Sequence, residues 1–452
     1  MTSLAGYCRI AAGLLRRLLL GVSATALGLV ISPVTAVALD LDGTDGLNTD
    51  TIANRERLRV WDDARKYGAE AVGTRDRREL KPDGIRAGEY IVYPTVGAVV
   101  VFDDNVLAHD IEKKSDIRTE LTPSVKFQSQ FPRHALDFSL DGKIVNYLEN
   151  TDQDYASARA RVEGALHFDH AHTLSASALT ALEYEERNDP SYPLTAKGPI
   201  EVFHNKAAAG ITRDVGRLYG TISAAAESWS YSDVEAVNGS TLDQQGRDTA
   251  IFSNQVKVGY RISPGFELVG KVKGLRAENR GDLKIDRDAW GFEALAGLAF
   301  EVNPLLRWRI LGGYGVRDFD QANLANLNTT LLEADIQWLP TQRLTIYATV
   351  AREILETTDL ASTGAIQSSA RLKAEYDIYH NLILSAAAEI REDDYSSLNR
   401  RDRVYSGTAG LDYYFTKNWL FTFAYEHQVR DSNFDSLDMN RNRFTIGAKL
   451  RF

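Results

Sequence analysis

The last nine residues of the chain alternate strictly between apolar and polar side chains. Side chains on an extended strand point alternately to its two faces. One face would carry Phe444, Ile446, Ala448, Leu450 and Phe452, and the other would carry arginine, lysine, threonine and glycine. The first face suits hydrocarbon and the second suits water. The chain therefore ends in an amphipathic strand, and its last residue is aromatic.

This ending resembles the C-terminal recognition strand of Gram-negative outer-membrane β-barrels. The resemblance implies that Phe452 is a membrane-insertion signal and that the barrel-assembly machinery is a partner. A soluble β-sandwich can also end in an amphipathic strand, so the remainder of the chain has to decide between the two.

The beginning of the chain predicts export. Three arginines, Arg9, Arg16 and Arg17, precede an apolar run over 18–31, and Ala36-Val-Ala38 follows as a small-x-small cleavage site. This order is typical of a secretory signal peptide over 1–38, and the apolar run is too short for a spanning helix. Cleavage would also remove Cys8, the only cysteine. The mature protein would then have no disulfide and no thiol chemistry.

Composition leaves two classes of exported protein. The mature sequence has no apolar stretch long enough for a transmembrane helix, which takes about 18–20 residues. The full sequence contains 20 Tyr, 17 Phe and 33 Gly, which favours either a large secreted β protein or a barrel whose apolar outer face is diluted by a polar lumen. The net charge of -10 argues against a nucleic-acid partner.

A repeat of hairpins favours the barrel. Short turn signals recur about 37 to 40 residues apart, at 263–265, 302–304, 339–341, 379–381 and 416–418. Longer polar segments lie between them, at 188–199, 232–247, 278–287 and 431–440. Short turns at one end and long loops at the other are typical of outer-membrane barrels embedded in outer-membrane lipid.

The pattern predicts an all-β fold, a transmembrane antiparallel barrel of about 18 strands over 90–452. The expected strands are 90–102, 117–128, 134–147, 156–168, 173–186, 200–212, 217–231, 248–262, 265–277, 288–301, 305–318, 327–339, 343–355, 364–377, 382–394, 402–415, 419–430 and 441–452. An even number places both ends of the barrel in the periplasm. Trp308, Trp338, Trp419 and Tyr425 fall near strand ends, as in interfacial aromatic girdles.

Two prolines mark the first two strands as irregular. Pro94 and Pro123 cannot donate a ladder hydrogen bond, so we expect each at a strand end or a bulge. The seam between the first and last strands would then be the least regular pairing.

Alternation also assigns charged residues to the lumen. The lumen and periplasmic-mouth candidates are Arg261, Lys271, Lys273, Arg307, Arg309, Arg371, Lys373, Lys449 and Arg451. Four acidic residues, Glu267, Glu301, Asp377 and Asp412, lie at the same depth as the mouth arginines, so the mouth is mixed in charge. These side chains either select solutes or are merely solvated positions of the wall.

The segment 39–89 differs from the barrel. It begins with acidic residues and glycines, and 51–66 could form a helix after the capping signal at 48–50. The segment is either a partly ordered periplasmic tail or an element that plugs the pore or docks a partner.

One stretch resembles a known family. Pro82-Asp-Gly-Ile-Arg-Ala-Gly88, then Tyr93-Pro94, then Phe102-Asp-Asp-Asn105 are similar to the start of the barrel in the β-barrel porin type 2 family. Several such barrels are encoded with exopolysaccharide assembly systems, so the resemblance implies a secretion porin for exopolysaccharide. A periplasmic polysaccharide-export protein would then be a further partner. The resemblance supplies no catalytic or ligand residues.

Enzymatic and metal sites are not predicted. The histidines do not form a catalytic constellation at the outer ends of strands. His170 and His172 could share a strand face but lack a third ligand, and Glu392-Asp-Asp394 is more simply a solvated loop tip than a calcium site. We therefore expect no catalytic residue, cofactor or metal.

Two functions of different classes remain. The first is a conduit, either a polysaccharide export channel or a general diffusion porin for small hydrophilic solutes. The second is a plugged barrel with a structural or surface-interaction role. A barrel of this size leaves an aqueous channel unless loops fill it. The expected location in every case is the Gram-negative outer membrane.

Overall fold

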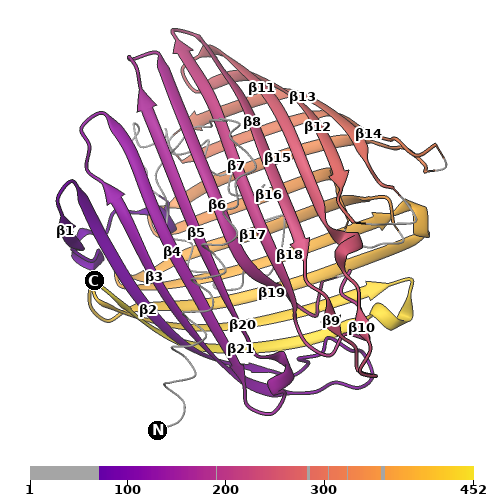
Figure 1. The fold of residues 1–452 in the computed structure, drawn as a ribbon. Helices are drawn as coiled ribbons and strands as arrows, with labels where there is room; N and C mark the ends of the chain where they lie inside the picture. Colours follow the sequence, from indigo (N-terminus) through magenta and orange to yellow (C-terminus); the bar gives the residue numbers. More distant parts are fainter. Residues whose placement is uncertain (1–70, 190, 282–285, 304, 323, 358–361) are drawn as a thin grey trace.

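The computed structural model describes residues 71–452, apart from 190, 282–285, 304, 323 and 358–361. The predicted signal peptide (1–38) and the predicted helix over 51–66 lie outside the described residues. The described chain forms one closed barrel of antiparallel strands, which tilt strongly relative to the barrel axis (Figure 1). In the described part of the chain, no helix is long and apolar enough to cross a membrane.

Eighteen long strands build the barrel wall. They are β2 (Tyr90–Asp103), β3 (Asp116–Ser129), β4 (His134–Tyr147), β5 (Tyr155–His167), β6 (His172–Glu185), β7 (Ile200–Val215), β8 (Leu218–Tyr231), β11 (Thr249–Ser263), β12 (Phe266–Asn279), β13 (Ala289–Asn303), β14 (Leu306–Phe319), β15 (Leu327–Thr341), β16 (Leu344–Leu355), β17 (Ala365–Tyr379), β18 (Leu382–Tyr395), β19 (Arg400–Tyr414), β20 (Trp419–Ser432) and β21 (Met439–Arg451). Each pairs with its neighbour in the chain, and β21 closes on β2. The predicted strand number is confirmed, and the predicted ends differ from these by about three residues or fewer.

Short strands and 3-10 turns lie at the two ends of the barrel. They are β1 (Ile85–Ala87), β9 (Val234–Glu235), β10 (Thr241–Leu242) and the 3-10 turns η2 (Val72–Thr74), η3 (Arg78–Leu80), η4 (Thr151–Gln153), η5 (Gln245–Arg247), η6 (Ser396–Leu398) and η7 (Asp435–Leu437). The strand β1 pairs with the start of β2, whereas β9 and β10 form a small hairpin inside the loop between β8 and β11.

The closing seam is regular, which corrects the sequence prediction. β2 and β21 pair from Thr95 to Asp103 in one unbroken register. The register shifts lie instead beside the short turns, for example where β11 meets β12 and where β15 meets β16. The tight turns at this end force the irregularity, and the seam has no turn.

The prediction of a strand end or a bulge is wrong for both prolines. Pro94 lies within β2, where the neighbouring strand changes from β1 to β21. Its carbonyl accepts a hydrogen bond from the backbone N–H of Phe452, 3.1 Å away. The backbone N–H that proline lacks would have pointed to the same side, so only the last residue of the chain is left without that donor. Pro123 lies inside β3, and the pairing of β3 with β4 is interrupted at Thr122 and Pro123 while the register stays unchanged.

The two faces of the wall have the predicted chemistry. Large apolar side chains such as Leu268, Phe292, Ile310 and Ile446 are exposed on the outer face, where lipid would cover them. Charged side chains occupy the alternate positions and point inward. Because closure leaves no free edge, the wall satisfies its backbone groups within itself, as a hydrocarbon environment demands.

Two inward-facing glycines mark a close approach of β13 and β14. A Cβ added to Gly297 would lie 1.9 Å from the carbonyl oxygen of Ile310, and one added to Gly313 would lie 1.9 Å from that of Ala294. The adjacent outward-facing Gly312 has open space around it. The inner surface of the wall therefore has no room for side chains at Gly297 and Gly313.

Candidate pore and its constrictions

A large cavity fills the interior of the barrel. It has a volume of about 1660 Å³ and is lined by residues of β5 to β8, of β11 to β14 and of β16 to β21. Among the described lining residues, thirteen are acidic and thirteen are basic. The wall of the cavity is thus strongly polar but carries no excess of either sign.

Most lumen charges belong to local ion pairs. Arg309 donates to Asp335 (2.7 Å), Arg317 donates to Glu293 (2.6 Å), and Lys206 lies 3.2 Å from Glu227. These partners lie on neighbouring or nearby strands, so alternation along each strand places them on the same inner surface. A solute in the cavity would meet alternating charges of both signs.

The structure places the predicted lumen residues in two groups. Arg261, Lys273, Arg307, Arg309 and Arg371 line the cavity. Lys271, Lys373, Lys449 and Arg451 are not among its lining residues. The influence of either group on solute selection stays a prediction.

Ion pairs explain why Lys271 and Lys373 do not line the cavity. Lys271 pairs with Glu333, and Lys373 lies 3.1 Å from Glu375, so both ammonium groups are held against the wall. The mouth is mixed in charge as predicted, since Arg261 lies 3.4 Å from Glu267 and Arg307 lies 3.3 Å from Glu301.

The loop between β6 and β7 folds into the barrel. Asn188 donates to the side chain of Gln428 (3.3 Å), and the guanidinium of Arg430 donates to the carbonyl oxygen of Asn188 (2.9 Å). Both partners lie on β20, which is several strands away around the wall. Tyr192 and Ala196 of the same loop are buried against the outer ends of β7 and β8. The loop therefore narrows the outer part of the lumen.

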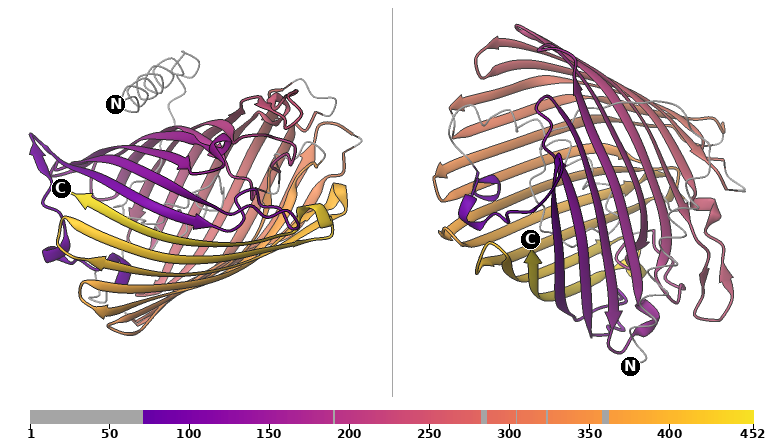
Figure 2. Two further views of the ribbon diagram at one scale, coloured as in Figure 1. Left: turned by 90° about the horizontal axis from the view of Figure 1, so that it is seen from below. Right: turned by 60° about the vertical axis from the view of Figure 1, so that its left-hand side comes forward.

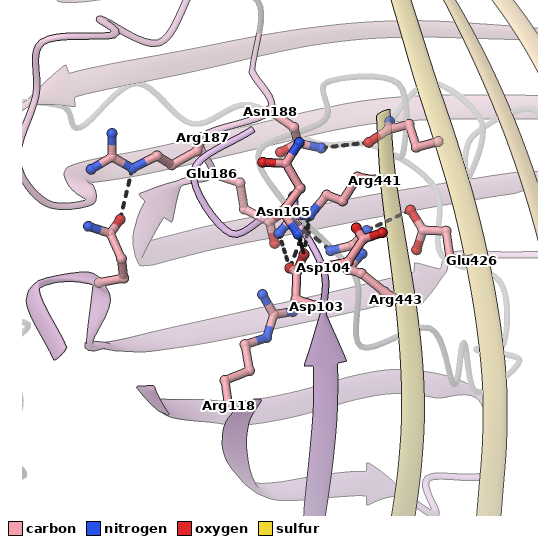
Figure 3. A network of polar contacts seen from close by, with 12 residues as sticks. Asp103, Asp104, Asn105, Arg118, Glu186, Arg187, Asn188, Glu426, Arg441 and Arg443 are labelled. Atoms are coloured by element: carbon pink, nitrogen blue, oxygen red, sulfur yellow. Dashed lines mark hydrogen bonds and ion pairs between the residues drawn. The ribbon is translucent and has the colours of Figure 1, made fainter. Parts of the chain in front are cut away.

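The Asp-Asp-Asn stretch lies beside this loop, as Figure 3 shows. Asp103 accepts hydrogen bonds from Nε of Arg441 on both carboxylate oxygens, each at 3.0 Å. The side chain of Asp104 accepts from the backbone and side chain of Asn442, both at 2.6 Å. Asn105 donates to the carbonyl oxygen of Asn440 at 3.0 Å. The three side chains fasten the end of β2 to the start of β21 at the outer end of the seam.

Glu186 connects the infolded loop to this seam. Its carboxylate lies 3.5 Å from Arg443 and 3.9 Å from Arg441. Burial alone would raise the pKa of Glu186, but the positive charges of Arg443, Arg118 and Arg441 lower it to about 2. Glu186 is therefore ionised at any physiological pH and holds the loop electrostatically.

A second obstruction lies at the periplasmic mouth. This is the end of the barrel that carries the short turns, the start of β2 and the end of β21. We call residues 71–83 the strap. Figure 2 shows this indigo segment beside the ends of the orange and yellow strands. Val72 is fully buried and its N–H donates to Thr345 of β16 (2.9 Å), while the N–H of Gly73 donates to Glu375 of β17 (2.8 Å). These contacts hold the first part of the strap on one side of the mouth.

Arginines fix the strap at both ends. Arg75 and Arg77 both pair with Asp377 of β17, the latter at 2.7 Å. At the other end, Arg451 donates to the carbonyl oxygen of Leu80 (3.1 Å) while its guanidinium lies over the ring of Tyr414. The strap therefore runs along one side of the mouth, from β16 and β17 to β21.

Replacing Asp377 with asparagine should release the strap. The change removes the shared carboxylate of two guanidinium groups, and each charge-assisted hydrogen bond is worth roughly 1.5–3 kcal/mol. We expect trypsin to cleave at the strap arginines about tenfold faster or more, because cleavage follows the population of the open form. Glu301→Gln removes a carboxylate from the same mouth without touching the strap and should leave the cleavage rate unchanged. Equal rates in the two variants would show that Asp377 does not hold the strap.

The structure gives no support to a metal site at the two candidates weighed in the sequence. Within the described residues, no group of three or more His, Cys, Asp or Glu side chains is arranged to hold a metal ion. His172 instead pairs with Asp169 (2.9 Å). Glu392 and Asp394 pair with arginines of the next strand, Arg403 at 2.8 Å and Arg401 at 2.9 Å.

The fold is a closed antiparallel barrel with an apolar outer face and a charged cavity, and it has short turns at one end and long loops at the other. These features define an outer-membrane barrel of the porin type. The family model described as "Putative beta-barrel porin 2" matches residues 78–452. The chain belongs to this family, so the family resemblance seen in the sequence is confirmed. The protein is located in the Gram-negative outer membrane.

Solved structures from two bacteria are similar to the chain. OpdK of Pseudomonas aeruginosa, in complex with vanillate, is 10% identical with a TM-score of 0.44, and the match covers 80% of this chain and 99% of OpdK. OpdL of the same organism is 14% identical with a TM-score of 0.43, covering 81% and 100%. OccAB3 of Acinetobacter baumannii is 10% identical with a TM-score of 0.44, covering 81% and 100%. No curated protein matches the chain in sequence.

Proposed function

We propose that the protein is a passive channel for small hydrophilic solutes. The observation that carries this proposal is the charged cavity of about 1660 Å³, which is narrowed by an infolded loop on the outer side and bordered by the strap at the periplasmic mouth. Balanced charges of both signs keep a solute hydrated without holding it strongly. The solute would move down its own gradient, with no chemistry and no cofactor.

Export of exopolysaccharide is the second candidate, and the family resemblance is what favours it. A polymer needs a continuous path that stays open along its whole length. The loop contacts of Asn188 with β20 narrow such a path on the outer side, and the strap contacts with Asp377 narrow it at the periplasmic mouth. Export would therefore require both elements to withdraw, and an inner-membrane machine to supply the free energy.

Conductance and solute uptake test the first proposal. Purified full-length protein in planar bilayers should give steady ohmic conductance with weak preference between K⁺ and Cl⁻, because the lining charges balance. Liposomes that contain it should swell in small sugars at rates that fall with sugar size. Wild-type protein that carries no current and admits no sugar would contradict the proposal.

A deletion strain separates the two candidates. We expect slower uptake of small hydrophilic solutes and unchanged surface polysaccharide. Loss of secreted polysaccharide, with polymer trapped in the periplasm and solute uptake unchanged, would instead favour export. The barrel variant Arg307→Glu serves as a control for assembly in the same strain, since it alters a cavity-lining charge without touching the strap or the infolded loop.

A further inference from the structure

One lysine in the cavity wall differs from its neighbours. Lys257 lies near the middle of β11 and lines the cavity. Among the described residues, no carboxylate lies within ion-pair distance of its Nζ, which lies over the ring of Tyr219, 5.9 Å from the ring centroid. Lys206 and Lys273, which line the same cavity, lie 3.2 Å and 3.9 Å from Glu227 and Glu293.

Tyr219 positions this ammonium group. Its ring lies over Gly259, where an added Cβ would come within 2.0 Å of the ring. The phenol donates to Glu267 (2.9 Å), and the guanidinium of Arg261 lies over the other part of the ring, 4.9 Å from its centroid. The ring is therefore held between Lys257 and Arg261, the cations two positions before and after the glycine.

The carboxylates near Lys257 already have other ion-pair or hydrogen-bond partners. Lys271 lies directly opposite Lys257 in the pairing of β11 with β12, and it pairs with Glu333. Asp335 is taken by Arg309 (2.7 Å), and Glu267 is shared by Tyr219 and Arg261. The charge of Lys257 is thus left for a mobile anion, with cations on its flanks.

We propose that Lys257 forms an anion-binding subsite in the channel wall, which takes the carboxylate of a small hydroxylated organic acid. This inference rests on the proposed solute channel. Thr221 faces Lys257 across the β8–β11 pairing, and Thr221 and Gln255 both line the cavity, so hydroxyl and amide groups stand beside the ammonium. A single lysine acts as a point charge and suits a monovalent carboxylate. Phosphate is better matched by forked arginines, and those nearby are committed to Asp214 and Asp335.

Block of the chloride current by gluconate tests the subsite. In planar bilayers with full-length protein, gluconate should reduce the current through the wild type in a saturable way. Lys257→Gln should raise the half-blocking concentration about tenfold or more, as expected when a hydrogen bond to a charged group is lost. Lys257→Arg should retain most of the block. Lys206→Gln, which neutralises a paired lysine of the same cavity, should retain it as well.

Two results would overturn the subsite: unchanged block in Lys257→Gln, or equal loss of block in Lys206→Gln. Binding to detergent-solubilised protein, read as broadening of gluconate proton resonances in magnetic resonance spectra, decides the same question without conduction. Loss of broadening in Lys257→Gln alone supports the subsite, and equal broadening in wild type and variant rejects it. Absence of current in the wild type would contradict the channel function but would leave this binding measurement decisive for the subsite.

Discussion

Replacing Asp103 with asparagine should lower the free energy of unfolding of the barrel by about 3–5 kcal/mol, the typical cost of removing one partner from a buried ion pair. Asp103 is fully buried and Arg441 nearly so, and the guanidinium contacts both carboxylate oxygens. The variant would leave the positive charge of Arg441 buried at the seam. Glu186, 3.9 Å away, would compensate it only in part.

Urea unfolding in lipid vesicles measures this loss. Asp110→Asn changes an exposed acid of the adjoining loop and should leave the unfolding curve unchanged. The double variant Asp103→Leu with Arg441→Met should recover much of the stability, because an apolar pair no longer leaves a buried charge. An unfolding midpoint for Asp103→Asn equal to that of Asp110→Asn would mean that the pair does not secure the seam.

Replacing Gly313 with valine should prevent closure of the barrel. A Cβ at this position would lie 1.9 Å from the carbonyl oxygen of Ala294 and 2.7 Å from Cα of Leu295, so β13 and β14 would have to separate. Overpacking that forces side chains and backbone to shift typically costs about 1–3 kcal/mol and occasionally more. Separation of the strands would also break ladder hydrogen bonds that no other group can replace in lipid.

Detergent gels of unboiled and boiled samples report closure, because a closed barrel stays compact until it is boiled. We expect the wild type and Gly312→Val to migrate differently before and after boiling, since Gly312 faces outward into open space. We expect Gly313→Val to migrate at the unfolded position in both samples. A heat-modifiable band for Gly313→Val would show that the wall can open at this point at little cost.

The wall could be predicted from the sequence because its pattern is local. Each strand alternates apolar and polar residues, and each hairpin carries its own turn residues, as at Ser263-Pro-Gly265. A strand that must face lipid on one side and water on the other leaves little freedom of register. Alternation also assigned Arg307 and Arg309 to the inner face, where both line the cavity.

The contacts of the infolded loop were beyond this reasoning, and for the strap the sequence offered only the alternative that 39–89 plugs the pore, because both elements depend on distant partners. The polarity of 188–199 indicated a loop, and nothing local indicated that Asn188 would reach Arg430, 242 residues later. The strap was equally hidden, since Arg77 and Asp377 are 300 residues apart in the sequence. Side chains such as Tyr192 and Val72 were a local signal, because a large apolar side chain in an otherwise polar segment suggests burial.

The strap has a consequence for the order in which the protein matures. Residues 71–83 precede every strand of the barrel, yet their partners Thr345, Asp377 and Arg451 belong to the last quarter or so of the chain. The place where the strap binds does not exist until β16, β17 and β21 are in position. A docked strap is therefore a mark of the finished molecule, and resistance of its arginines to trypsin would distinguish completed barrels from those stalled during assembly.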